Sequence, residues 1–87
     1  MYHAIGVIEL KSIAKGIEAT DAALKSAGIS LISAHAACPG KYEIILTGNI
    51  SDVTAAVEAG SQHAKDQGVF FGSTVIPAPH AELWAQI

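Results

Sequence analysis

The sequence predicts an α+β domain with the element order βαββαβ. In this fold class one antiparallel sheet carries two main helices on one face, and a short C-terminal helix follows. Two alanine-rich segments have helical periodicity, and each lies between short apolar runs rich in β-branched residues. At 87 residues the chain has room for one hydrophobic core, so we expect a single domain over residues 1–87.

The first half of the chain predicts a strand, a helix and a second strand. Residues 2–10 (YHAIGVIEL) are apolar and β-branched, which is typical of a strand. Ser12 is a residue type preferred at a helix N-cap. Four apolar residues then recur at the spacing of an amphipathic helix: Ile13, Ile17, Leu24 and Ala27. Residues 29–37 (ISLISAHAA) alternate along the chain and indicate the second strand.

A hairpin is expected in the middle of the chain. Cys38, Pro39, Gly40 and Lys41 predict a turn, because proline restricts φ and glycine accepts a positive φ. Residues 42–47 (YEIILT) indicate a third strand after this turn. The second and third strands therefore pair around it.

The second half predicts another helix and a fourth strand. Ser51 is the expected N-cap of the helix, and Gly68 is expected to end it. The side chains predicted to face inward are Val53, Ala56, Val57 and Ala64. Gly60 lowers helix propensity, so we expect a close packing contact there. Residues 69–76 indicate a strand that two prolines end, and residues 80–87 predict a short helix or tail.

An offset of 40 residues relates the two halves of the chain. It pairs residues of the same kind in the two helical segments: Glu18 with Glu58, Lys25 with Lys65, Ile13 with Val53, and Ile17 with Val57. Together with the element order, this repeat is typical of the split-βαβ, ferredoxin-like pattern.

Composition excludes several classes of function. The chain has five lysines, no arginine and eight acidic residues, and its net charge is −3. Binding to nucleic acid is therefore not expected, because phosphate backbones are contacted by clustered Lys and Arg. No apolar run approaches the roughly 20 residues of a membrane span, and no signal peptide is visible. With 51% hydrophobic residues in so small a chain, we expect apolar surface left over for partner subunits.

Cys38 is the residue with the most possible chemistry. At an exposed turn its thiol is a candidate nucleophile, a candidate metal or cluster ligand, or a residue without a chemical role. Because Cys38 is the one cysteine of the chain, an intrachain disulfide is excluded, and this fits a reducing cytoplasm. His35, on the preceding strand, is badly placed to act as its base, and no paired acid and base emerge elsewhere, so no enzyme is expected. One thiol per chain also cannot hold a metal or an iron–sulfur cluster unless several copies meet at an axis.

Several motifs together resemble bacterial microcompartment shell proteins with a single BMC domain, the class that forms hexamers. They are AIGVIEL, EATDAALKSAGI, CPGKY, GNISDVTAAVEAG and VIPAPHAELW, which run in order over residues 2–84. The resemblance implies the βαββαβ BMC fold and a cyclic homohexamer. Such hexamers tile, with other shell proteins, into the shell of an organelle in the cytoplasm. It also implies a central pore for small metabolites.

The resemblance assigns residues to two places in the tile. The pore loop falls on Ala37, Cys38, Pro39, Gly40 and Lys41. The hexamer edge falls on Lys25, whose stem would pack against a neighbouring tile, and on a motif that contains Ala78 and His80. The family usually has arginine at the position of Ala78, so that donor to the neighbouring hexamer is absent here.

The cysteine in the loop resembles that of the tandem-domain shell trimer of propanediol-utilisation microcompartments. The resemblance implies an alternative function, electron transfer or metal binding through an iron–sulfur cluster that several subunits share at Cys38. A cubane cluster has three-fold but no six-fold symmetry, so six equivalent thiolates do not match it, and no cofactor is the main expectation. A third alternative is a regulatory ferredoxin-like domain that binds a small ligand between the subunits of a dimer.

Overall fold

The computed structural model describes residues 3–26 and 28–87, and it contains the predicted order of elements. These elements are β1 (Ala4–Leu10), α1 (Ile13–Ser26), β2 (Ser30–Ala36), β3 (Tyr42–Gly48), α2 (Ile50–Asp66), β4 (Phe70–Ile76) and the 3-10 helix η1 (Ala81–Gln86). The strand boundaries differ from the predicted ones by one or two residues, and Tyr2 and Ala27 lie outside the described residues. Within residues 3–26 and 28–87 no helix is both long and apolar enough to cross a membrane.

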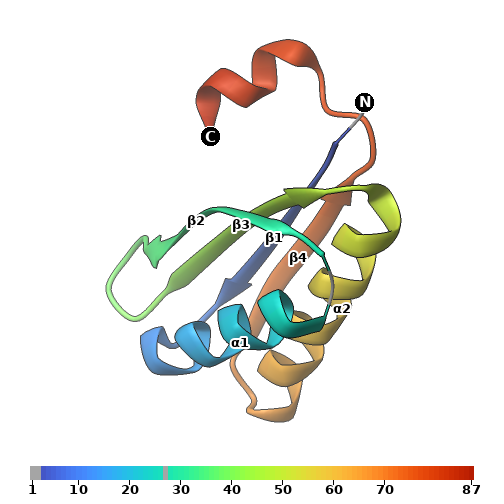
Figure 1. Ribbon diagram of the computed structural model, residues 1–87. Helices are drawn as coiled ribbons and strands as arrows, with labels where there is room; N and C mark the ends of the chain where they lie inside the picture. Colours follow the sequence, from blue (N-terminus) through green and yellow to red (C-terminus); the bar gives the residue numbers. More distant parts are fainter. Residues whose placement is uncertain (1–2, 27) are drawn as a thin grey trace.

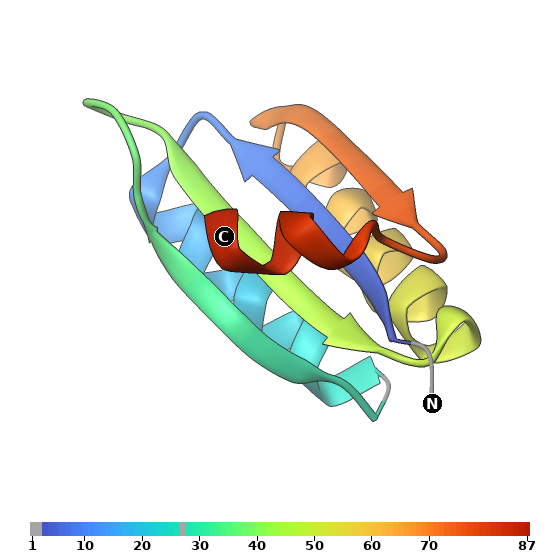
Figure 2. The same ribbon diagram turned by 90° about the horizontal axis from the view of Figure 1, so that it is seen from above.

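The four strands form one sheet in the order β2-β3-β1-β4, and all neighbouring strands are antiparallel. Both long helices cover one face of this sheet, and η1 lies on the opposite face (Figure 1). Seen from above, η1 crosses over the middle of the sheet (Figure 2). The predicted α+β class, the hairpin and the placement of the helices are therefore confirmed.

Different loops and helix ends lie at the two ends of the sheet. At the first end Leu10 of β1 pairs with Tyr42 of β3 and with Phe70 of β4, and the turn between β2 and β3 extends beyond them. We call this the loop end. At the second end Ile5 pairs with Thr47 and Ile76. The C-terminus of α1, the start of α2 and the chain that follows β4 lie there (Figure 1), and we call it the far end.

The core lies between the sheet and the two helices and is almost entirely aliphatic. Its largest fully buried side chains include Ile8, Leu10, Ile44, Leu46 and Val53. Each contributes roughly 1.5–3 kcal/mol through removal from water. The expected close contact at Gly60 is confirmed, since a Cβ atom there would lie 2.6 Å from Ile8 Cδ1 and 3.4 Å from the carbonyl oxygen of Ala19. Gly60 thus brings α2 down onto both the sheet and α1.

The apolar stripe that indicated the first helix does not face the core. Ile13, Ile17 and Leu24 are 43%, 57% and 43% exposed. The buried residues of α1 are small ones, namely Gly16, Ala19, Thr20 and Ala23. A Cβ atom at Gly16 would collide with the ring of Tyr42, so α1 approaches the sheet too closely for large side chains on its inner face. The apolar stripe therefore faces outward.

The ends of the helices confirm two predictions and correct one. The Ser12 hydroxyl accepts a hydrogen bond from the amide of Lys15 at 3.1 Å, as an N-cap does. The second helix is capped by Asn49 and not by Ser51, since Asn49 Oδ1 accepts from the amide of Asp52 at 2.9 Å. Ser51 instead donates its hydroxyl to the same Asn49 oxygen at 2.8 Å. Gly68 follows the helix with a φ of +71°, as expected of the glycine that ends it.

Candidate functional site

The loop at residues 37–41 is a compact exposed turn at the loop end of the sheet. The amide of Lys41 donates to the carbonyl of Cys38 at 3.0 Å, and the amide of Ala37 donates to the carbonyl of Lys41 at 3.3 Å. Gly40 has a φ of +76°, a backbone conformation that side chains disfavour. All five residues are exposed, so the loop presents both backbone and side chains outward. The predicted turn is thus confirmed.

Cys38 lies in this loop as a free and exposed thiol. Within residues 3–26 and 28–87 no group of three or more His, Cys, Asp and Glu side chains could hold a metal ion. An iron–sulfur cluster needs about four ligands, whereas one chain brings a single thiolate. The donor set of this chain alone therefore does not fit a cluster.

His35 faces a glutamate in the adjacent strand. It pairs across the sheet with Glu43, and its Nε2 lies 4.0 Å from Glu43 Oε1. Glu43 in turn pairs directly with Glu9 of β1. Three titratable groups therefore form one row across β2, β3 and β1, next to the loop end.

Lys41, the last residue of the loop, reaches the aromatic ring of Phe71 in β4. Its Nζ lies 4.5 Å from the ring centroid, and the Nζ of Lys11 lies 5.3 Å from the same centroid. Phe71 is 49% exposed. Sequence reasoning missed Lys11 and Phe71 because their meeting depends on strand register. The available signals were the Phe70–Phe71 pair, which cannot alternate regularly in a strand, and a lysine directly after the first strand.

The residues assigned to the tile edge lie at the far end of the sheet. Lys25, in the last turn of α1, forms an ion pair with Asp21 one helical turn earlier at 2.8 Å, and its side chain is 75% exposed. Ala78 and His80 follow β4 and are exposed. The Nδ1 of His80 accepts from the amide of Glu82 at 3.1 Å and caps η1. That histidine therefore has its Nε2 left for another contact.

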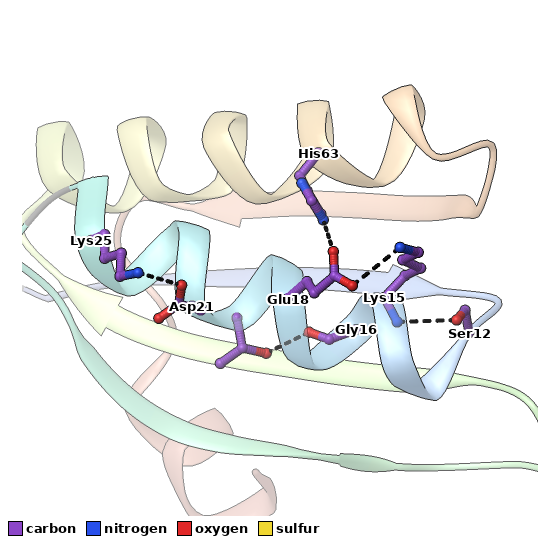
Figure 3. Close-up of polar contacts among 8 residues, drawn as sticks. Ser12, Lys15, Gly16, Glu18, Asp21, Lys25 and His63 are labelled. Carbon is purple, nitrogen blue, oxygen red and sulfur yellow. Dashed lines mark hydrogen bonds and ion pairs between the residues drawn. The ribbon is translucent and has the colours of Figure 1, made fainter.

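A cluster of three polar residues, Lys15, Glu18 and His63, links the two long helices on their outer surface. Glu18 of α1 lies between His63 of α2 and Lys15, with a distance of 3.1 Å to each (Figure 3). The hydrogen bond from Lys15 lowers the pKa of Glu18 below its ordinary value, and His63 acts in the same direction. This group ties the outer surfaces of the two helices together.

The family model that matches this chain is the BMC domain, and it covers residues 4–79. The chain is 45% identical over 83 residues to the bacterial microcompartment shell protein PduT of Citrobacter freundii, across 95% of this chain and 44% of that protein. It is 35% identical over 80 residues to the shell protein PduA of the same organism, across 92% of this chain and 86% of that protein.

A solved structure has the same fold. The crystal structure of a microcompartment protein from Desulfitobacterium hafniense DCB matches with a TM-score of 0.86 and 37% sequence identity, over 95% of this chain and 45% of that one. The chain thus spans less than half the length of this structure and of PduT. The fold and both ends of the sheet fall within the matched region.

Proposed function

Because this chain belongs to the BMC-domain family of bacterial microcompartment shell proteins, we propose that it is a structural shell subunit, not an enzyme, that forms cyclic hexamers around a central pore. The observation that supports this most is the separation of its two candidate sites. The loop 37–41 lies at the loop end, and Lys25, Ala78 and His80 lie at the far end (Figure 1). An elongated subunit measuring 35 × 24 × 16 Å can place one end at an axis and the other at the rim of a ring.

The two long sides of the subunit differ, which favours a ring over a two-fold dimer. One side has the edge strand β2 and the outward stripe of Ile13, Ile17 and Leu24. The other side has the edge strand β4, and a groove there between α2 and β4 is lined by Ser61, Lys65 and Ser73, among others. A contact between two unlike surfaces repeats head to tail, and it closes into a ring when the rotation allows.

In the ring, Ala37, Cys38, Pro39, Gly40 and Lys41 line the pore. The amides of Cys38 and Gly40, which do not donate within the turn, and the Lys41 ammonium favour anions and polar neutral metabolites over cations. At the rim, the stem of Lys25 packs against the next tile while its ammonium hydrogen-bonds there, and Ala78 supplies no such donor. The domain over residues 1–87 then acts as one unit of the shell, beside other shell proteins.

Native mass spectrometry of protein purified without oxygen tests this function. We expect a six-fold mass with no iron or sulfide adduct. Ile17→Asp places a charge on the exposed stripe that the proposed subunit contact would bury, so the mass should shift toward the monomer. Ile17→Val should retain the hexamer. A stable dimer would contradict the ring and favour a regulatory domain. A three-fold or six-fold mass carrying iron and sulfide, lost in Cys38→Ser, would favour the electron-transfer alternative.

A further inference from the structure

We propose that Lys11, Lys41 and Phe71 form a binding site for small anions with a carboxylate or phosphate group, at the loop end of each subunit. Lys41 belongs to the loop already described, but Lys11 and Phe71 come from elsewhere in the chain. Their convergence is a feature of the tertiary structure.

Two positive charges gather around one aromatic ring at this point. Each ammonium lies within 5.3 Å of the Phe71 centroid, so the two nitrogens are no more than about 10 Å apart. Within residues 3–26 and 28–87, the lysines that form an ion pair with a carboxylate are Lys15 and Lys25, and no ion pair involves Lys11 or Lys41. The ring attracts both cations through its electron-rich face but leaves their charge uncompensated. An anion that contacts both would relieve their repulsion.

The backbone explains why these three residues meet. Leu10 pairs with Tyr42, so Lys11 and Lys41 each lie one residue beyond the same pair. The amide of Lys11 donates to the carbonyl of Val69 at 2.8 Å, which holds it beside the start of β4. The register of β1 and β4 shifts between Glu9 and Leu10, and Phe71 is the extra residue at this irregularity. Such a bulge re-aims a side chain, here the ring that both lysines contact.

The neighbouring charges limit where an anion can lie. Glu9 and Glu43 form the next row of the sheet, two residues from Lys11 and Lys41 respectively, and His35 lies beside Glu43. The space at Gly72 is also close to a carboxylate, since a Cβ atom there would lie 3.7 Å from Glu9 Oε1. An anion is therefore repelled from the middle of the sheet. It is held by the two ammonium groups, toward the loop, and not by the ring, whose electron-rich face attracts only the cations.

The position of this site gives it a role in the proposed pore. That role rests on the hexamer and the pore proposed above, whereas binding itself needs only one chain. Six copies at the loop end would place twelve ammonium groups near the axis, arranged as pairs. Anionic metabolites would then be concentrated at the pore mouth before they cross. Lys11 and Phe71 thereby become specificity-determining residues beside Lys41.

A titration of inorganic phosphate into the protein labelled with 13C on phenylalanine tests the site. The chain has two phenylalanines, and they form an internal comparison. Two lysines lie over the ring of Phe71, whereas Phe70 packs against the core and has Lys65 over its ring at 4.9 Å. At constant ionic strength we expect the Phe71 ring signals to shift and saturate, while those of Phe70 shift little.

Three variants sharpen the test. Lys11→Gln and Lys41→Gln should each weaken phosphate binding about three- to fivefold, the effect of removing one exposed charge. Lys65→Gln removes the same charge from the other ring and should leave the binding constant unchanged. Equal weakening by all three, or a Phe71 response that rises linearly without saturation, would overturn the proposal.

The mass of the assembly, measured on the same samples, separates this inference from the proposed function. If the Phe71 ring signals shift and saturate in a protein that is not hexameric, the anion site is supported and the ring is rejected. A hexamer whose Phe71 signals do not respond would reject the site alone.

Discussion

The two long helices occupy equivalent positions in the two halves of the chain, yet matched apolar residues are buried in one helix and exposed in the other. The 40-residue offset places Ile13, Ile17 and Leu24 of α1 opposite Val53, Val57 and Ala64 of α2. The three residues of α2 are at most 6% exposed, whereas those of α1 are at least 43% exposed. The same spacing thus serves the core in one helix and the surface in the other.

The difference follows from what lies beneath each helix. Gly6 of β1 leaves space that Val53 and Val57 of α2 fill, since a Cβ atom there would lie within 3 Å of both. Under α1 the ring of Tyr42 already occupies the space, so Gly16 must face it. Periodicity therefore locates a helix more reliably than it locates its buried face. An apolar stripe displaced from the core becomes available to a partner.

The largest expected effect comes from truncating matched residues of the two helices. Val53→Ala removes two buried methyl groups and leaves a cavity, so we expect unfolding free energy to fall by about 2–3 kcal/mol. Ile13→Ala, at the equivalent position of α1, should change the stability of the isolated subunit by less than about 0.5 kcal/mol. Urea unfolding at a protein concentration where both variants are monomeric measures both. Equal losses would show that α1 contributes its stripe to the core.

Giving α1 the alanine that α2 has at the matching inner position should lower the free energy of unfolding somewhat less. Gly16 of α1 corresponds by the offset to Ala56 of α2. In Gly16→Ala the added methyl collides with Tyr42, and we expect a loss of about 1–3 kcal/mol despite the better helix propensity of alanine. Tyr42→Leu in the same background should restore part of the loss. Stability unchanged in Gly16→Ala would mean that the ring moves aside freely.

The helix caps should show a smaller difference. Asn49→Ala removes the side chain that caps α2, and thermal unfolding should show a loss of about 1 kcal/mol. Ser12→Ala removes the corresponding bond in α1 and should cost a similar amount. Ser51→Ala is the control, because its hydroxyl donates to the Asn49 side chain and caps no backbone amide of the described residues, and the loss should be a few tenths of a kcal/mol. A larger loss of stability for Ser51→Ala than for Asn49→Ala would show that Ser51, and not Asn49, caps α2.

The smallest expected effect concerns the link between the helices at Glu18. Its pKa is lowered in the folded state, so its ionised form adds stability that is fully present above its ordinary value of 4.5. That contribution is lost as pH falls through the lowered folded-state pKa. Glu18→Gln should therefore flatten the fall of unfolding free energy below pH 4.5. Lys25→Gln, at the separate Asp21 pair, should leave this part of the profile unchanged.

Much of this molecule is determined by local sequence. The order of elements follows from β-branched runs, helical spacing and the glycines that end helices, all of which act over a few residues. The turn at Cys38–Lys41 is likewise local, because Pro39 and Gly40 restrict its backbone. The family resemblance followed from motifs along the chain, and the BMC-domain match supports it.

Contacts between segments that are distant in the sequence depend on how the sheet and the helices pack. Whether Ile17 is buried depends on Tyr42, which lies 25 residues further along the chain. The cap at Asn49 was missed because two neighbouring polar residues compete for one role, and backbone geometry selects between them. Lys11, Lys41 and Phe71 meet through the register of three strands and one bulge. Local sequence encodes the elements, whereas packing and register determine which of their side chains meet.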